Sequence, residues 1–177
     1  VFHATGVGGQ SMEKLADSGL LAGAIDVSTT EIADEVVGGV LSAGPTRLDV
    51  FARHPLPYVG SCGALDMVNF GPWESVPERF KGRLLHRHNP TVTLMRTTVE
   101  ENRELGARLA ARVNESVGPV TVLLPLQGIS VISAPGGPFH WPEADAALFD
   151  TIKTNLRPDI PVIERDCVIN APEFAEA

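Results

Sequence analysis

The sequence predicts an α/β protein, a Rossmann-like three-layer sandwich with a mostly parallel sheet. Its 177 residues suit a single domain spanning residues 1–177. Strand-like and helix-like segments alternate along the chain, which is typical of βαβ units. The run Val120–Leu126 is almost continuously apolar, as in strands that are buried on both faces. We therefore expect helices on both faces of the sheet and ligands beyond the carboxyl ends of its strands.

The first third of the chain supplies two βα units. Residues Val1–Ala4 resemble the end of a buried strand, and a glycine-rich loop separates them from an amphipathic helix over about Ser11–Leu21. A short strand is expected at Ala22–Val27. The sequence from Ser28 to Glu31 has the form of a capping box and predicts a helix, with Ile32, Val36 and Val40 on one face.

The remaining elements follow from β-branched runs and helix-start signals. Capping-box residues Thr98 to Glu101 open a helix with Val99, Gly106, Leu109 and Val113 on its core face. Pro142 suits the first turn of a helix that runs to about Leu156. Residues 72–83 are expected to form a loop. Extended segments are expected at Tyr58–Gly60, Leu84–Asn89, Thr91–Arg96, Val120–Leu126 and Ile160–Glu164, and a last helix at Asn170–Ala177.

Composition excludes several classes of partner. The formal net charge of −8 disfavours nucleic acid, because phosphate binding normally leaves a basic footprint. No apolar run approaches the ~20 residues that a membrane span needs, and no signal peptide is evident. The two cysteines, Cys62 and Cys167, have no metal or redox spacing. We expect two free thiols and a cytoplasmic protein that binds neither nucleic acid nor membrane.

The glycine-rich loop is the leading candidate for binding. Glycines between a strand and a helix allow close backbone approach, and free N–H groups at a helix start favour a phosphate or carboxylate. The loop lacks the Gly-x-Gly-x-x-Gly and Gly-Lys-Ser/Thr patterns, so it is neither a dinucleotide fingerprint nor a P-loop. A tight turn required only for packing is the alternative. The predicted ligand-binding residues are Thr5, Gly6, Gly8, Gly9, Gln10 and Ser11.

Other polar residues carry weaker signals. His86 and His88 alternate in a possible strand and could bind zinc with His3 or His54, but flanking Arg and Asn residues favour a solvated stretch, and we predict no metal site. Cys62 could be a nucleophile or a small buried thiol. Three aspartates at or just after expected strands, Asp26, Asp66 and Asp166, could hold a ribose hydroxyl or cap a helix. Arg96, at the end of an expected strand, could bind a phosphate or pair with nearby glutamates.

Several longer runs resemble one family. The opening Val1–Gly9 with Met12-Glu13, the stretch Gly63–Gly71 and the run Thr93–Thr98 after His88-Asn89-Pro90 are similar to the tomato mosaic virus resistance protein-like ATP-binding family. Matches continue through Leu124–Leu126, Pro135–Phe139 and Ile169-Asn170, so the resemblance covers essentially the whole chain. Val168 and Ala171 depart from a His-Ile-Asn-Asp-Pro pattern, which puts a polar role of that loop in doubt.

The resemblance implies a two-domain protein about twice this length, with this chain as its C-terminal half. It also implies ATP binding, and a plant member that blocks viral replication by engaging the viral replication protein. Three hypotheses follow. The first is a nucleotide- or phospholigand-binding domain with its ligand at Gly6–Gly9. The second is an enzyme with its site between this domain and the N-terminal half, acting on a small phosphorylated or carboxylated metabolite through His3, Asp66, Arg96 and Asn170. The third is a protein-interaction module. Homo-oligomers are a further expectation.

Overall fold

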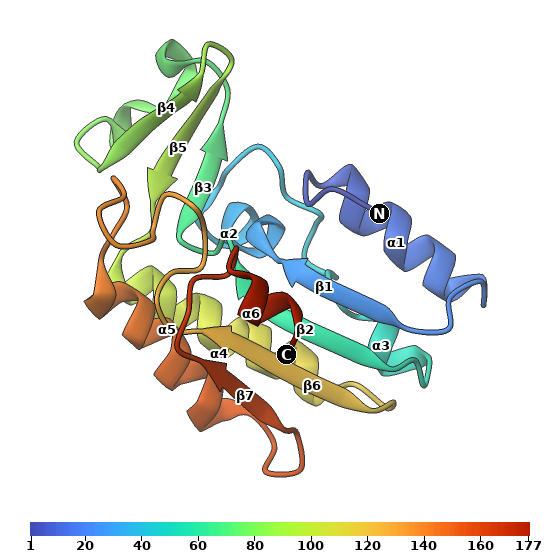
Figure 1. The fold of residues 1–177 in the computed structure, drawn as a ribbon. Coiled ribbons are helices and arrows are strands. Elements are labelled where there is room, and N and C mark those ends of the chain that lie inside the picture. Colours follow the sequence, from blue (N-terminus) through green and yellow to red (C-terminus); the bar gives the residue numbers. More distant parts are fainter.

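A parallel four-stranded sheet forms the centre of the domain (Figure 1). The computed structural model describes residues 1–177. The strands are β1 (Ala24–Ser28), β2 (Tyr58–Gly63), β6 (Val120–Pro125) and β7 (Val162–Arg165), and they lie in the order β1-β2-β6-β7. All three neighbouring pairs are parallel. The predicted α/β class and mostly parallel sheet are therefore confirmed.

The helices lie on both faces of this sheet, but unequally. The long helices α4 (Val99–Asn114) and α5 (Pro142–Asn155) pack together behind the sheet in Figure 1, whereas the short α6 (Pro172–Ala175) lies in front of it. The strand order follows the chain order and never reverses. Because parallel crossovers are right-handed, successive connections in one direction place their helices on the same face. The front face therefore receives little helical cover.

The other helices lie towards the β1 side of the molecule. They are α1 (Val7–Asp17), α2 (Thr30–Val37) and α3 (Val50–Arg53). Helix α2 ends where Gly38 adopts a φ of +101°, a left-handed conformation that suits glycine. Val40, which the sequence placed on this helix, therefore lies beyond its end.

A second, antiparallel sheet projects from the body (Figure 1). It consists of β3 (Met67–Phe70), β4 (Leu85–Asn89) and β5 (Val92–Arg96), in the order β3-β5-β4. Two 3₁₀ turns, Trp73–Ser75 and Glu78–Phe80, occupy the stretch predicted as a loop. The sequence predicted β4 and β5 as extended but missed β3, since four residues are too few to show a periodicity.

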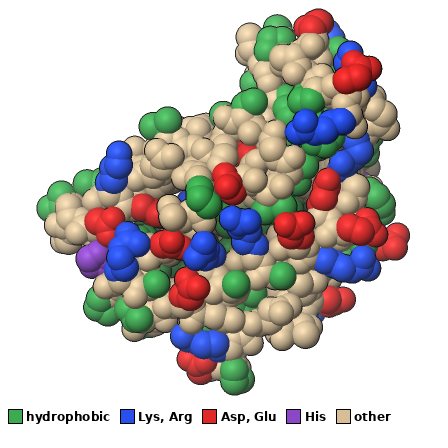
Figure 2. Space-filling model, turned by 180° about the vertical axis from the view of Figure 1, so that it is seen from behind, with side chains coloured by type: hydrophobic (Ala, Val, Ile, Leu, Met, Phe, Trp, Pro, Cys, Tyr) green, Lys and Arg blue, Asp and Glu red, His purple; other side chains and the backbone are tan.

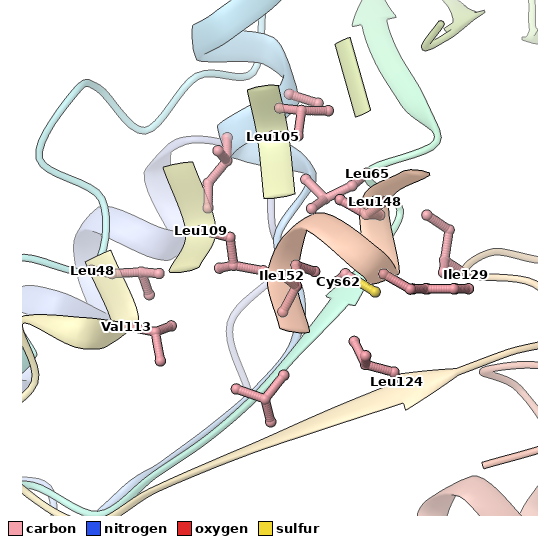
Figure 3. Close-up of a cluster of buried hydrophobic side chains, with 14 of the residues drawn as sticks. Leu48, Cys62, Leu65, Leu105, Leu109, Val113, Leu124, Ile129, Leu148 and Ile152 are labelled. Carbon is pink, nitrogen blue, oxygen red and sulfur yellow. The ribbon is translucent and has the colours of Figure 1, made fainter. Parts of the chain in front are cut away.

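One continuous core joins the sheet to the helices behind it. The side chains of β2 and β6 that face backwards pack against the apolar faces of α4 and α5, and Figure 3 shows Cys62, Leu124, Leu109 and Ile152 in this cluster. The surface on the opposite side of these helices carries acidic and basic side chains in close alternation (Figure 2). The predicted core face of α4 is confirmed, because Val99, Gly106, Leu109 and Val113 are all buried.

Two local predictions concern helix starts. The capping box at Thr98 is confirmed: Thr98 accepts a hydrogen bond from the Glu101 N–H, and the Glu101 carboxylate accepts one from the Thr98 N–H. The capping box at Ser28 is wrong. The N-cap of α2 is Thr29, which makes no side-chain cap because its hydroxyl donates to the Ser61 carbonyl at 3.1 Å. The Glu31 carboxylate accepts from Gly6 and Gly9 instead of reaching back to the helix start.

The N-terminal segment also differs from its prediction. Val1–Ala4 is not a strand, and helix α1 begins at Val7 rather than Ser11. A strand requires a ladder partner. The segment lies near the free edge of β1, but a cavity bounded by both segments separates them.

Candidate functional site

A cavity of about 430 Å³ lies along the free edge of β1. Strand β1 pairs only with β2, so its other edge faces this space. The N-terminal segment, the whole of β1 and the first turns of α1 line the cavity. Its walls are mainly apolar, and its polar side chains are His3, Asp26, Ser28, Glu31 and Arg47.

The glycine-rich loop borders this cavity, and two of its N–H groups are already engaged by a carboxylate. The N–H groups of Gly6 and Gly9 donate to Glu31 Oε1, at 2.6 and 3.1 Å. The Glu31 side chain is fully buried. A carboxylate of the protein itself thus takes the place at the start of α1 that a ligand anion would take. A phosphate could reach these two donors only by displacing Glu31.

The other residues predicted for this loop are engaged within the protein. Thr5 Oγ1 donates to the His3 carbonyl at 3.4 Å, and Ser11 Oγ donates to the Val7 carbonyl at 2.7 Å. Gln10 Nε2 donates to the Ala43 carbonyl at 3.3 Å. A Cβ atom at Gly8 would lie 1.7 Å from the His3 carbonyl oxygen, so the backbone path itself requires glycine there. A Gly8 substitution would therefore disturb packing before it reported on a ligand.

Arg47 completes a buried charge cluster beneath the cavity. Its guanidinium contacts Glu31 Oε2 at 2.8 Å, Asp26 Oδ2 at 2.6 Å and Glu13 Oε1 at 3.1 Å. Three carboxylates therefore surround one cation. Burial raises the pKa of both Asp26 and Glu13, and Arg47 opposes that rise. With all three carboxylates ionised the cluster carries a net charge of −2, which favours cationic or hydrogen-bond-donating ligands over anions.

A second buried cluster surrounds Arg96, at the carboxyl ends of β2 and β5. Arg96 is 1% exposed and donates to Asp145 Oδ1 at 2.6 Å and to the Phe139 carbonyl at 2.9 Å. Asp66 accepts from Ser130 Oγ at 2.8 Å through Oδ2, whereas its buried Oδ1 has no partner. Burial raises the pKa of Asp66 to about 6. This cluster ties the loops after β2, β5 and β6 together, and neither Asp66 nor Arg96 lines the β1-edge cavity.

Cys62 lies in the core beside Leu124 and Ile129 (Figure 3). Burial raises the pKa of its thiol above the ordinary value, and a nucleophilic cysteine needs the thiolate. This environment favours the buried-thiol interpretation. Cys167 is also a free thiol, half-buried in the segment after β7.

The histidines and the C-terminal polar residues are dispersed. His86 stacks edge-on against Phe139, at 6.1 Å between ring centroids, and His54 contacts Asp17 at 2.9 Å. No group of three or more His, Cys, Asp or Glu side chains is arranged to hold a metal ion. Asp166 accepts from Gln127 at 2.6 Å, and Asn170 is exposed beside α6. Of the four predicted catalytic candidates, only Asp66 and Arg96 share a cluster, and only His3 lines the cavity.

Sequence reasoning missed most of the Arg47 cluster. Asp26 was recognised as a strand-end residue, but Glu13, Glu31 and Arg47 were not selected. The sole available signal was Glu31 in an apparent capping box, where it was assigned to the wrong N–H groups. Arg47 lies in a loop with no motif around it, and only the fold brings it to β1. None of the helices combines the length and apolar character needed to cross a membrane.

Comparison with known proteins identifies relatives of the whole chain. Residues 1–177 match the family described as "Uncharacterised protein family (UPF0261) C-terminal domain". UPF0261 proteins of Rhizobium meliloti (strain 1021) and Mesorhizobium japonicum are 56% and 52% identical, each covering 100% of this chain and 45% of the relative. The ToMV resistance protein Tm-1(GCR237) of Solanum lycopersicum is 45% identical over 100% of this chain and 24% of its own length.

These matches agree with the resemblance found in the sequence runs and with its assignment to a C-terminal half. The chain spans less than half the length of these relatives. Because the family match extends over all 177 residues, the chain belongs to the UPF0261 family as its C-terminal domain.

Proposed function

We propose that this domain holds the nucleoside part of a nucleotide, with ATP as the candidate, in the cavity at the β1 edge. The main support for this proposal is that the cavity combines apolar walls with the Asp26 carboxylate, one oxygen of which has no hydrogen-bond partner in the protein. Both hydrogen bonds to the Asp26 side chain go to Oδ2, from Arg47 at 2.6 Å and from the Tyr58 hydroxyl at 3.5 Å. Oδ1 is left as an acceptor for a ribose hydroxyl, a role that a carboxylate also has in dinucleotide-binding folds. Asp26 is the third residue of β1, so it would act from the middle of the strand and not from the strand end that the sequence suggested.

The size of the cavity supports the same proposal. A volume of about 430 Å³ falls within the range of roughly 300–1,000 Å³ that is usual for small-molecule sites. Apolar side chains can flank a base, and the remaining polar groups can fix its orientation. The apolar side chains that line the cavity include Phe2, Met12, Leu21, Ile25 and Val27.

The phosphates would point away from the glycine loop. Glu31 already accepts from the Gly6 and Gly9 N–H groups, and the surrounding cluster is rich in carboxylates. A triphosphate would therefore be repelled from this end of the cavity. We assign the phosphate contacts to the N-terminal half of the longer protein, so that the complete nucleotide site forms between the two halves.

The test is calorimetric titration of adenosine, ATP and inorganic pyrophosphate into this chain and into a version extended with its N-terminal half. We expect adenosine and ATP to bind this chain with similar affinity, and pyrophosphate not to bind. The extended protein should bind ATP more tightly than adenosine. Binding of ATP and pyrophosphate to this chain without binding of adenosine would overturn the proposal and favour a phosphate site at Gly6–Gly9.

A matched pair of variants locates the site. Asp26→Asn keeps the shape and a carbonyl oxygen for Arg47 but weakens the acceptor for a ribose hydroxyl. A hydrogen bond to a charged group contributes roughly 1.5–3 kcal/mol, so adenosine binding should weaken about tenfold or more. Asp166→Asn is the control, because Asp166 is exposed and contacts only Gln127. Unchanged adenosine binding by a folded Asp26→Asn variant would exclude this cavity.

Catalysis is the second candidate, and one observation favours it. His3 contributes the single imidazole that lines the cavity, and its side chain is exposed. In the extended protein, His3 would serve as a general base for a reaction on the bound nucleotide or on a second, phosphorylated or carboxylated substrate. His3→Ala should then abolish ATP turnover and leave adenosine binding within a factor of two. Absence of turnover in the extended parent protein would restrict the function to binding.

A further inference from the structure

The front face of the parallel sheet is apolar where water would demand polar residues. In neighbouring parallel strands, residues in register point to the same face. One row of register partners on the front face consists of Ile25, Val59 and Thr121. The next row, two residues further along the strands, consists of Ser61, Leu123 and Ile163. This face alternates with the buried one that carries Tyr58, Val122 and Leu124. Its one charged residue is Arg165, which pairs with Pro125 at the edge of the sheet far from β1.

Cover on this face is confined to the carboxyl ends of the strands. The segment that leads into α6 lies there, and a Cβ atom at Gly63 would meet the Ile169 side chain at 2.7 Å. Leu123 is accordingly buried, at 8% exposed. Towards β1 the cover ends: Ile25 is 78% exposed and Val27 is 41% exposed. Strands of a parallel sheet are normally covered on both faces, so this region lacks its second layer.

The winding of the chain explains why the domain does not supply that layer. With the order β1-β2-β6-β7, every crossover proceeds in the same direction and delivers its helix to the back. A helix on the front requires either a reversal of strand order or another part of the polypeptide. The four-residue α6 is too short to extend across the sheet.

We infer that the N-terminal half of UPF0261 proteins packs an apolar helical surface onto the front face at Ile25, Val27 and Val59. The relatives contain more than half of their length outside the region matched by this chain. Val1 lines the β1-edge cavity, so the residues that precede it in the relatives reach the domain beside this face. Ile25 and Val27 also line that cavity, so the docked half would border the proposed nucleotide site; the melting and exchange measurements below need no ligand and test the docking separately.

The test compares Ile25→Lys in this chain and in the extended protein. The solvent-exposed lysine should leave the melting temperature of this chain within about 2 °C, but lower that of the extended protein by roughly 5 °C or more, because the charge would then be buried. Val131→Lys is the control: Val131 is 71% exposed in the loop after β6, and the substitution should change neither protein.

Hydrogen exchange supplies an independent measurement on the unmodified proteins. Amides of β1 should exchange at least tenfold more slowly in the extended protein than in this chain, while those of the β4–β5 hairpin should be unchanged. Equal exchange of β1 in both proteins, together with equal effects of Ile25→Lys, would overturn the inference. So would a dimer of the extended protein that Ile25→Lys converts to monomers in light scattering, because a second copy would then cover the face.

Discussion

Two buried arginines show how similar ion pairs can have different consequences. Arg96 donates to backbone carbonyls and to Asp145, in a region that closes completely over it. Arg47 has carboxylate partners, and its cluster borders a cavity. The first arrangement fixes loops, whereas the second leaves charge and an acceptor facing open space. Burial of a charge therefore does not by itself indicate function; the surroundings of its partners decide.

The largest effect should come from removal of Arg96. Arg96→Met would leave Asp145 buried without its cation and the Phe139 carbonyl without its donor. Breaking a buried pair in this way costs about 3–5 kcal/mol. Urea denaturation should show that loss in the free energy of unfolding, while Arg53→Met, at an exposed pair with Asp17, should cost under about 1 kcal/mol. Equal small losses would show that Arg96 is not a structural tie.

Replacement of Glu31 tests whether its carboxylate stands where an anion would bind. Glu31→Ala leaves the Gly6 and Gly9 N–H groups and Arg47 Nε unpaired, and should cost about 2–3 kcal/mol. Phosphate should then raise the melting temperature of this variant, since a ligand that binds only the folded state stabilises it. The parent and Glu31→Gln, which keeps an acceptor oxygen, should not respond. An equal phosphate response in all three would place the anion elsewhere.

The Arg96 cluster should also make the free energy of unfolding depend on pH, through Asp66. The pKa of Asp66 is raised by burial to about 6 from 3.8, so the folded state retains this proton to higher pH than the unfolded state. Its stabilising contribution is complete below about pH 4 and is lost as the pH rises through 6. Asp66→Asn should thus be more stable than the parent by about 1–2 kcal/mol at pH 7, and nearly equal at pH 4.

Asp34 provides the contrast for that experiment. Burial also raises its pKa to about 6, but its two oxygens accept hydrogen bonds from the Leu41 and Asn69 N–H groups. An amide at this position would turn a donor towards one of those donors. Asp34→Asn should therefore destabilise the domain at pH 7, in unfolding measurements under the same conditions. Stabilisation by both substitutions would mean that burial alone controls these sites.

The smallest effect concerns the capping box at the start of α4, two residues after Arg96. Thr98→Ala removes the acceptor for the Glu101 N–H and should cost about 1 kcal/mol. Thr98→Ser keeps that acceptor and should cost a few tenths of a kcal/mol. Thermal unfolding of the two variants measures the difference directly, and indistinguishable variants would remove the capping box as a source of stability.

Local signals were sufficient for most of the fold. The apolar run of β6, the capping box of α4 and the proline at the start of α5 each lie within a few consecutive residues, and each was interpreted correctly. Strand β3 was missed because its four residues gain their identity only through pairing with β5. The unequal cover of the sheet depends on strand order, which no local pattern contains.

The candidate site was predictable only in part for the same reason. The glycine loop and Asp26 lie at positions that chain order alone identifies. The hydrogen bond between Glu31 and Gly6 joins residues 25 positions apart in the sequence. The contact between Arg47 and Glu31 depends on the path of the irregular loop that carries Arg47. Two of the N–H groups that the sequence suggested for a ligand anion, those of Gly6 and Gly9, donate to the Glu31 carboxylate in the structure.

The uniform strand order also has a consequence for how the polypeptide assembles during translation. Each strand of the parallel sheet pairs with the one synthesised before it, so a newly emerged segment always meets a finished neighbour. Domains generally fold as units during synthesis, with N-terminal domains first, so the order of strands matters for the stages before this domain is complete. Growth of this sheet needs no insertion between strands that have already paired. We expect ribosome-bound chains that end after β2 or β6 to contain native pairing, with the unfinished edge always on the side of the next strand.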